Sequence, residues 1–146
     1  MLVVLKGAVL FAADLMRELT VPFTVEFVAA SSYGTGTRSA GAVALGDIGR
    51  LQIAGRELLL VEDILDTGLT TTALIDRLRE KGPASLRICT LLDKRNGRAP
   101  HLPVAYAGIV IPDEFVVGYG MDYAERYRNL RAVYVLSFDD RRAGGA

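Results

Sequence analysis

The 146-residue sequence contains one cysteine, one histidine, no tryptophan and no net charge. A single cysteine excludes a disulfide framework within the chain. Cys89 lies in an apolar, strand-like run, so we expect a buried thiol and not a nucleophile. The 17 basic and 17 acidic side chains balance, which gives no general attraction for polyanions. We therefore expect a small-molecule partner and no nucleic acid.

Long hydrophobic runs are also lacking. No uncharged apolar stretch approaches the roughly 18 residues needed to cross a bilayer, and Lys6 interrupts the apolar amino terminus too early for a secretory signal. We expect a cytoplasmic protein without a membrane partner. The length suits one domain over residues 1–140, and the Arg, Ala and Gly residues of 141–146 predict a disordered tail.

Apolar runs alternate with helical patterns along the chain. The patterns predict two helices, at 9–19 and 70–81, and strands at 1–5, 23–30, 42–45, 58–61, 86–92, 104–111 and 132–136. This alternation favours an α/β fold with a parallel sheet flanked by helices on both faces. Small polar residues and three glycines at 31–41 predict a mobile loop that acts as a lid.

The segment 58–72 (LLLVEDILDTGLTTT) carries the strongest chemical signal. Its apolar run ends at Glu62 and Asp63, which places both acids at the carboxyl end of a buried strand. Ligands bind outside such ends in open α/β sheets, and paired carboxylates there accept hydrogen bonds from hydroxyls or hold a divalent cation.

The turn that follows, 66–70, suits an anion. It combines a glycine with hydroxyls and the N–H groups at the start of a helix, which together fit a phosphate. Acids and turn together indicate a sugar-phosphate site. The alternative is a loop with capping acids, which explains Asp66 or Thr67 but not the Glu62–Asp63 pair.

Several motifs together resemble the hypoxanthine-guanine members of the type I phosphoribosyltransferases. Residues 61–70 (VEDILDTGLT) resemble the family's phosphoribosyl-diphosphate motif, while 91–95 (LLDKR) and 111–129 (IPDEFVVGYGMDYAERYRN) resemble its purine-binding segments. With 5–7 and 32–34, the motifs cover most of the chain in the family's order. The implied fold is the type I phosphoribosyltransferase sheet with a small hood over the purine.

The resemblance implies purine salvage: transfer of phosphoribosyl from phosphoribosyl diphosphate to hypoxanthine or guanine with Mg²⁺, giving IMP or GMP and pyrophosphate. It also implies a homodimer or homotetramer. One alternative is a non-catalytic regulator of this fold that senses nucleotides and binds RNA or protein, but it would need a basic face. Another is an enzyme acting on a different base, against which Lys94 and Phe115 argue.

The family's roles can be carried over residue by residue. Asp66 would be the general base or proton relay facing the purine N7, and Glu62 and Asp63 would bind the ribose hydroxyls. Glu62 and Asp63 would also hold Mg²⁺, and Asp122 would hold a second Mg²⁺ or lie on the amine side of guanine. The residues that would surround the 5′-phosphate are Asp66, Thr67, Gly68, Leu69 and Thr70.

Purine binding would involve four further residues. Lys94 would donate to the exocyclic O6, Phe115 would stack on the ring, and the backbone of Val116 and Val117 would contact its edge. Without the resemblance, Lys94 is better explained as a solvated charge beside a turn, and 115–117 as a core strand.

The leaving pyrophosphate would be bound by Lys6, Gly7 and Arg128. A non-proline cis peptide is implied between Leu5 and Lys6, and the lid that excludes water would include Ser32 and Tyr33. Taken singly, Asp122 and Arg128 are ordinary surface charges.

The amino terminus differs from the family pattern, because members usually have several tens of residues before the Leu-Lys-Gly loop and here only five precede Lys6. We therefore expect a reduced hood formed by carboxyl-terminal residues, and apolar sheet surface that is left exposed.

Overall fold

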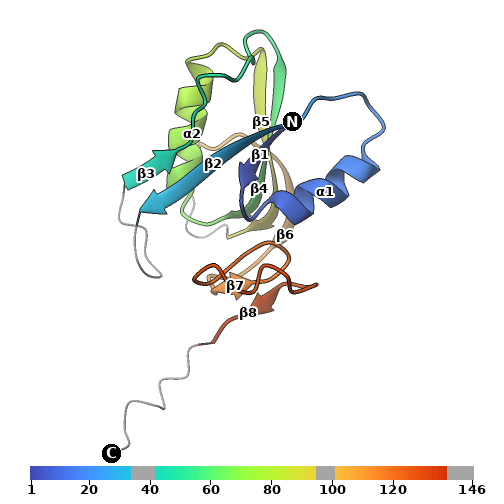
Figure 1. Ribbon diagram of the computed structural model, residues 1–146, viewed down its shortest axis with the longest axis vertical. Helices are drawn as coiled ribbons and strands as arrows, with labels where there is room; N and C mark the ends of the chain where they lie inside the picture. The colour runs from blue at the N-terminus through green and yellow to red at the C-terminus, as the bar shows by residue number, and fades with distance from the viewer. Residues whose placement is uncertain (34–41, 95–100, 138–146) are drawn as a thin grey trace, which may run out of the picture.

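The computed structural model describes residues 1–33, 42–94 and 101–137. Its main sheet has the order β3-β2-β1-β4-β5-β6 (Figure 1). All neighbours pair in parallel except β3, which is antiparallel to β2. The elements are β1 (Leu2–Leu5), α1 (Val9–Glu18), β2 (Glu26–Tyr33), β3 (Ala42–Leu45), β4 (Glu57–Leu65), α2 (Leu69–Arg79), β5 (Ser85–Asp93) and β6 (Val104–Val110).

One helix lies on each face of this sheet (Figure 1). Successive strand residues point to opposite faces, so Leu2 and Val4 pack in the larger core cluster with the buried leucines of α2. Val3 packs on the other side, with Ala8 and Ala12 at the start of α1. The predicted α/β class with helices on both faces is therefore confirmed.

Strand lengths differ from the sequence-based prediction. β2 begins at Glu26 and continues to Tyr33, so residues 31–33 belong to a strand and not to the expected loop. The reason is the antiparallel pairing of 30–33 with β3, which satisfies backbone groups that a loop would leave to water. The rest of that expected loop, 34–41, and the expected tail at 141–146 lie outside the described residues.

The central strand β4 is also longer than predicted. We expected it to end at Val61, but pairing with β5 continues through Leu65. Glu62 and Asp63 therefore lie inside the strand, within its last four residues, and not beyond its end. A prediction from the apolar run alone makes such a strand too short. The backbone hydrogen bonds to the neighbouring strand continue through the polar residues that follow the run.

A small hood faces the carboxyl ends of the sheet strands (Figure 1). It contains β7 (Val116–Val117) and β8 (Tyr134–Val135), which form a separate antiparallel pair. The strand predicted at 132–136 is therefore shorter than expected and does not join the main sheet. Four non-glycine residues between the two strands have positive φ: Tyr119, Ala124, Glu125 and Tyr127.

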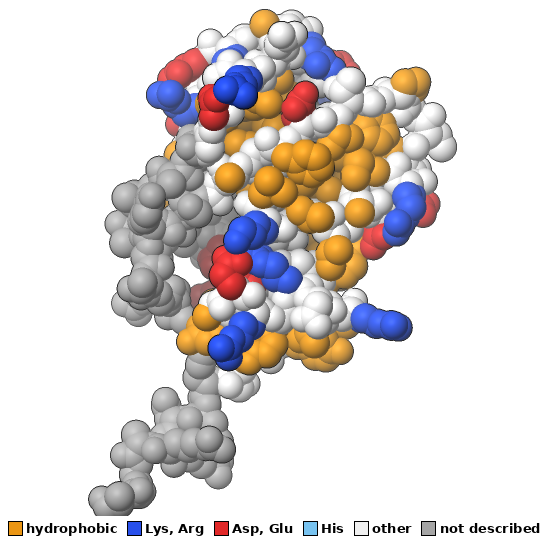
Figure 2. All heavy atoms as spheres, in the orientation of Figure 1, with side chains coloured by type: hydrophobic (Ala, Val, Ile, Leu, Met, Phe, Trp, Pro, Cys, Tyr) orange, Lys and Arg blue, Asp and Glu red, His pale blue; other side chains and the backbone are white. Residues whose placement is uncertain are grey.

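Apolar side chains are exposed on the side of the molecule that carries α1. Figure 2 shows hydrophobic atoms gathered across this part of the surface. Exposed residues from α1 and the segment after it include Val9, Leu10, Val21 and Phe23. Exposed apolar side chains of the sheet itself include Phe27 on β2 and Tyr106, Ile109 and Val110 on β6. No helix in the described ranges is both long enough and apolar enough to cross a membrane.

Candidate active site

Glu62 and Asp63 leave β4 on opposite faces of the sheet. Glu62 points toward α2 and accepts a hydrogen bond from the buried Thr71 hydroxyl, with 3.1 Å between Thr71 Oγ1 and Glu62 Oε1. Asp63 points toward the turn before α1, where a Cβ atom added to Gly7 would overlap its carboxylate. The period-two geometry of a strand explains the divergence. The two carboxylates therefore have different surroundings and do not form one pair.

Burial perturbs both acids. Removal from water, followed by the nearby charge of Asp63, raises the pKa of Glu62 to about 8, although the bond from Thr71 opposes the shift. Burial also raises the pKa of Asp63, against the opposing effect of backbone hydrogen bonds and Arg128. Strongly perturbed carboxyls at the end of a sheet are typical of functional sites.

The turn at Lys6 and Gly7 lies between Asp63 and the hood. The peptide bond between Leu5 and Lys6 is cis, as the resemblance implied. Gly7 packs on the Asp63 carboxylate, and Gly120 of the hood packs on the Gly7 carbonyl so closely that neither glycine has room for a Cβ atom. Lys6 extends to the hood, where its Nζ lies 2.9 Å from Glu125 Oε2. Two different parts of the chain thus form one surface around Gly7.

The turn after β4 leads directly into α2. Gly68 has φ +76°, a conformation that glycine adopts without steric cost, and it immediately precedes the first helical residue. Thr67 Oγ1 accepts a weak hydrogen bond from the Leu69 N–H at 3.4 Å. The predicted phosphate turn, 66–70, therefore presents hydroxyls and the N–H groups of a helix N-terminus at the same end of the sheet as the acids.

Lys94 joins the ends of neighbouring strands. It follows β5 directly, and its buried ammonium donates to Asp66 Oδ2 and to Asp113 Oδ1, each at 3.1 Å. The Lys94 side chain is only 9% exposed. The interpretation as a solvated charge beside a turn is therefore wrong, because a buried ammonium persists where carboxylates neutralise it.

The hood positions the remaining predicted residues. Phe115 precedes β7, is half-buried and packs edge-to-face against Tyr123, with ring centroids 5.6 Å apart. Val116 and Val117 form β7 itself. Arg128 is directed inward: one terminal nitrogen lies 2.7 Å from Asp122 Oδ1, and the other donates to the Gly120 carbonyl at 2.8 Å. In this state the guanidinium holds the hood together.

The carboxylates suit Mg²⁺ only in part. Within the described ranges, no group of three His, Cys, Asp or Glu side chains is placed to hold a metal ion. Burial raises the pKa of Asp63, and the charge of Asp122 adds to that rise. One or two carboxylates are enough for Mg²⁺ when substrate phosphates and water complete its octahedron. The Asp63 and Asp122 oxygens fit that requirement, whereas Glu62 points to the other face.

Ser32 and Tyr33 lie at the end of β2, where their backbones pair with Val43 and Ala42 of β3. They are therefore at the carboxyl end of the sheet, two strands from β4. This is the end that carries the other predicted residues. Their predicted role on a lid depends partly on residues outside the described ranges.

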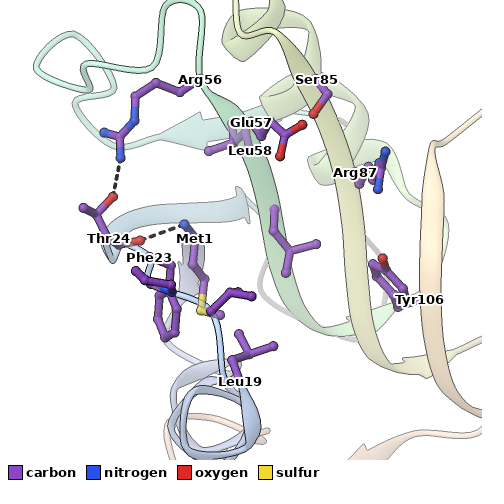
Figure 3. Close-up of a pocket in the computed structure, with 13 residues that line it drawn as sticks. Met1, Leu19, Phe23, Thr24, Arg56, Glu57, Leu58, Ser85, Arg87 and Tyr106 are labelled. Carbon is purple, nitrogen blue, oxygen red and sulfur yellow. Dashed lines mark hydrogen bonds between the residues drawn. The ribbon is translucent and has the colours of Figure 1, made fainter.

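A separate hollow of about 440 Å³ lies at the opposite end of the strands. Figure 3 shows Met1, Leu19, Phe23 and Tyr106 around it, with Arg56 and Glu57 at the start of β4. Because the acids, Lys94 and the hood lie at the carboxyl ends, this hollow is not part of the candidate site.

Sequence reasoning missed three residues that hold the site together. Thr71 bonds Glu62, Glu125 pairs with Lys6, and Asp14 accepts a hydrogen bond from the Tyr119 hydroxyl, which joins the hood to α1. The last two contacts connect residues more than 100 positions apart. Only the helical pattern of α2 could have indicated that Thr71 faces the sheet.

Known proteins share this sequence and fold. Residues 2–124 match the phosphoribosyl transferase domain model. The hypoxanthine-guanine phosphoribosyltransferase of Mycobacterium avium is 49% identical over 142 residues, which are 97% of this chain and 68% of that protein. The hypoxanthine phosphoribosyltransferase of Haemophilus influenzae is 48% identical over 126 residues, 86% of this chain and 70% of that protein.

Solved structures agree with these matches. A crystal structure of a hypoxanthine-guanine phosphoribosyltransferase from Bacillus anthracis superposes with a TM-score of 0.84 at 46% identity, and the match covers 93% of this chain and 80% of that one. A Trypanosoma cruzi hypoxanthine phosphoribosyltransferase gives 0.82 at 45% identity, covering 93% and 71%. The chain therefore belongs to the phosphoribosyltransferase family, and within it to the group of hypoxanthine-guanine phosphoribosyltransferases.

Proposed function

We propose that the protein transfers the phosphoribosyl group of phosphoribosyl diphosphate to N9 of hypoxanthine or guanine, giving IMP or GMP and releasing pyrophosphate. One observation carries the choice of base: the Lys94 ammonium lies 3.1 Å from the Asp66 carboxylate at the carboxyl end of the sheet. This places a fixed donor beside an acceptor. A 6-oxopurine with its proton on N7 presents the matching pair, because the O6 acceptor and the N7–H donor are adjacent on one edge of the ring.

The two side chains then have complementary tasks. Lys94 donates to O6, and Asp66 accepts the proton from N7 as N9 forms its bond to C1′ of the ribose. General-base assistance of this kind contributes about 10²–10⁴-fold to the rate. Adenine carries an amine in place of O6, so it would set a donor against the Lys94 donor, at a cost of about 1–3 kcal/mol. Phe115 stacks on the ring, while the backbone of Val116 and Val117 contacts its edge.

The sugar phosphate occupies the rest of the strand ends. The 5′-phosphate binds the turn of Asp66, Thr67, Gly68, Leu69 and Thr70, supported by the N–H groups at the start of α2. Glu62 and Asp63 bind the ribose hydroxyls. Their placement on opposite faces of β4 allows each to contact a different hydroxyl, since one lies on the α2 side and the other on the Gly7 side.

Pyrophosphate leaves across the turn of Lys6 and Gly7. The Lys6 ammonium and the Arg128 guanidinium supply positive charge there, and release of either from its hood partner frees donors for the leaving group. Ser32 and Tyr33 would belong to the lid that excludes water, which limits hydrolysis of the activated sugar. Asp63 and Asp122 would hold Mg²⁺ together with the diphosphate, and the ion would stabilise the negative charge that develops on the leaving oxygens.

The proposed function also implies an oligomeric state and a cellular compartment for the protein. We infer a cytoplasmic homodimer or homotetramer. The exposed apolar residues Ile109 and Val110 of the edge strand β6 support self-association. Sedimentation velocity over a range of protein concentrations measures the assembly, and a monomer throughout would contradict it.

A spectrophotometric assay tests the activity. Purified protein is incubated with phosphoribosyl diphosphate and hypoxanthine, guanine, xanthine or adenine, with Mg²⁺ and with a chelator. We expect Mg²⁺-dependent formation of IMP and GMP and little product from adenine. Absence of turnover on any 6-oxopurine would overturn the proposal and favour a regulator of this fold that only binds nucleotides.

A further inference from the structure

Three side chains form an ion cluster across the ends of three neighbouring parallel strands. Asp66 follows β4, Lys94 follows β5, and Asp113 lies three residues past β6. The register explains their proximity, because Leu65 pairs with Asp93 and Asp93 pairs with Val110. Lys94 is the central member, with 3.1 Å to each carboxylate.

The backbone fixes the base of the Lys94 side chain. Its N–H donates to the Leu65 carbonyl at 2.9 Å, and the Ile111 N–H donates to the Asp93 carbonyl at 3.1 Å. These bonds continue the sheet ladder beyond β5 on both sides. The Lys94 backbone is therefore fixed, and the side chain can change position only by rotation about its own bonds. The two carboxylates restrict that rotation, because they hold the ammonium.

The two ion pairs use only part of the hydrogen-bonding capacity of Lys94. A lysine ammonium has three donors and no acceptor. Two donors are used by Asp66 and Asp113, and within the described ranges no third acceptor lies in hydrogen-bond distance of Lys94 Nζ. The ammonium nitrogen is tetrahedral. When two of its N–H groups are held by hydrogen bonds, the direction of the third N–H is fixed.

We propose that Asp113 is a positioning residue: by holding the Lys94 ammonium from the hood side, it aims the third donor at the substrate and so sets the preference for a 6-oxo over a 6-amino purine. This inference rests on the proposed function and adds a residue to it. Asp113 does not contact the purine in this scheme. It acts through Lys94 alone.

The high exposure of Asp113 distinguishes a role in orienting Lys94 from a role in stabilising the fold. The Asp113 side chain is 84% exposed, so its removal leaves no cavity. An ion pair with one exposed member contributes little to folding. Without Asp113, however, the buried ammonium keeps Asp66 as its sole described partner and turns toward it. The third N–H of Lys94 then no longer points toward the substrate, and the ammonium forms more of its hydrogen bonds with the Asp66 carboxylate.

The test compares Asp113→Ala, Asp113→Asn and a matched control, Glu114→Ala, whose exposed side chain lies next in the chain and has no described side-chain contact. Initial rates give KM for hypoxanthine and for phosphoribosyl diphosphate, and the ratio of kcat/KM for hypoxanthine over adenine. Thermal unfolding is measured alongside.

For Asp113→Ala we expect KM for hypoxanthine to rise about 10-fold and the hypoxanthine-to-adenine ratio to fall by a similar factor, which is the loss of one charge-assisted hydrogen bond. KM for phosphoribosyl diphosphate and the unfolding midpoint should not change. Asp113→Asn keeps an acceptor oxygen and should restore most of the hypoxanthine KM. Glu114→Ala should match the unmodified protein.

The outcomes distinguish the inference from the function beneath it. An unmodified protein that turns over no 6-oxopurine overturns both. An active protein whose Asp113→Ala variant keeps its hypoxanthine KM and its preference overturns the inference alone. Equal rises in both KM values, or a lower unfolding midpoint, would assign Asp113 a general structural role and also overturn it.

Discussion

Gly120 of the hood lies directly on the carbonyl oxygen of Gly7, with no space between them for a side chain. Gly7 in turn lies on the Asp63 carboxylate. The turn that we assign to pyrophosphate is therefore held between the central strand and the hood. The hood cannot move closer to this turn without displacing it, because the two backbones are already in contact.

Gly120→Ala tests this packing. The added methyl group would overlap the Gly7 carbonyl, and φ at this position is +101°, which alanine avoids. We expect a loss of about 3 kcal/mol or more in the free energy of unfolding, from overpacking and backbone strain together. Urea denaturation measures it. KM for phosphoribosyl diphosphate should also rise.

Gly55→Ala is the matched control for Gly120→Ala. Gly55 also has a positive φ, +68°, but a Cβ there meets no atom within 4 Å. Backbone strain alone should cost about 1 kcal/mol. Equal losses in the two variants would show that the contact with Gly7 has no role.

Asp66→Asn tests the general base. Asparagine has nearly the same shape but cannot take a proton from N7, so kcat should fall by about 10²–10⁴-fold. Binding of phosphoribosyl diphosphate, measured by calorimetry, should change little. Asp76→Asn on the exposed side of α2 serves as control. Full turnover by Asp66→Asn would show that the base is another group.

The raised pKa of Glu62 predicts how stability depends on pH in the absence of Mg²⁺. Its native pKa is about 8 against an ordinary value of 4.5, so between these values the folded protein holds a proton that the unfolded chain releases. The contribution to stability is complete below the lower value and is lost as pH rises through the upper one. Stability should therefore decrease toward alkaline pH.

Glu62→Gln removes this dependence, because glutamine does not titrate. Urea unfolding between about pH 5 and about pH 9 should give a flatter profile for the variant, which should exceed the unmodified protein in stability at the alkaline end. Glu57→Gln, at the exposed start of the same strand, is the control. Parallel profiles for all three proteins would contradict the assignment.

The hollow at the amino ends of the strands should bind a hydrophobic dye, because apolar side chains line it. Tyr106 lines it, on the side opposite Phe23 and Leu19 (Figure 3). Tyr106→Ser should lower the fluorescence of a bound hydrophobic dye without changing kcat, since the hollow lies at the far end of the strands. Tyr134→Ser, equally exposed but located in the hood, should leave dye binding unchanged. Loss of turnover in Tyr106→Ser would contradict the separation of the two regions.

Most of the candidate site residues lie in short contiguous motifs, and the roles of Lys94, Phe115 and Arg128 came only from the resemblance of those motifs to the family. The segments 61–70 and 111–129 contain the acids, the phosphate turn and the hood residues, and each lies where a strand or helix was predicted to end or begin. The cis bond before Lys6 was implied by the resemblance to the family and is present. The exact strand limits did not follow, because residues 31–33 and 62–65 are held in strands by pairing with neighbours far along the chain.

The sequence by itself determined the α/β class and the order of the elements, because periodicity is a local property, whereas most of the candidate residues came from motifs that resemble those of the family. Only the tertiary structure decided how those residues face one another. Strand geometry separates Glu62 from Asp63, and the register of three parallel strands brings Asp66, Lys94 and Asp113 together. Long-range packing joins Gly7 to Gly120 and Asp14 to Tyr119. Such contacts depend on backbone pairing between distant segments, which no local pattern specifies.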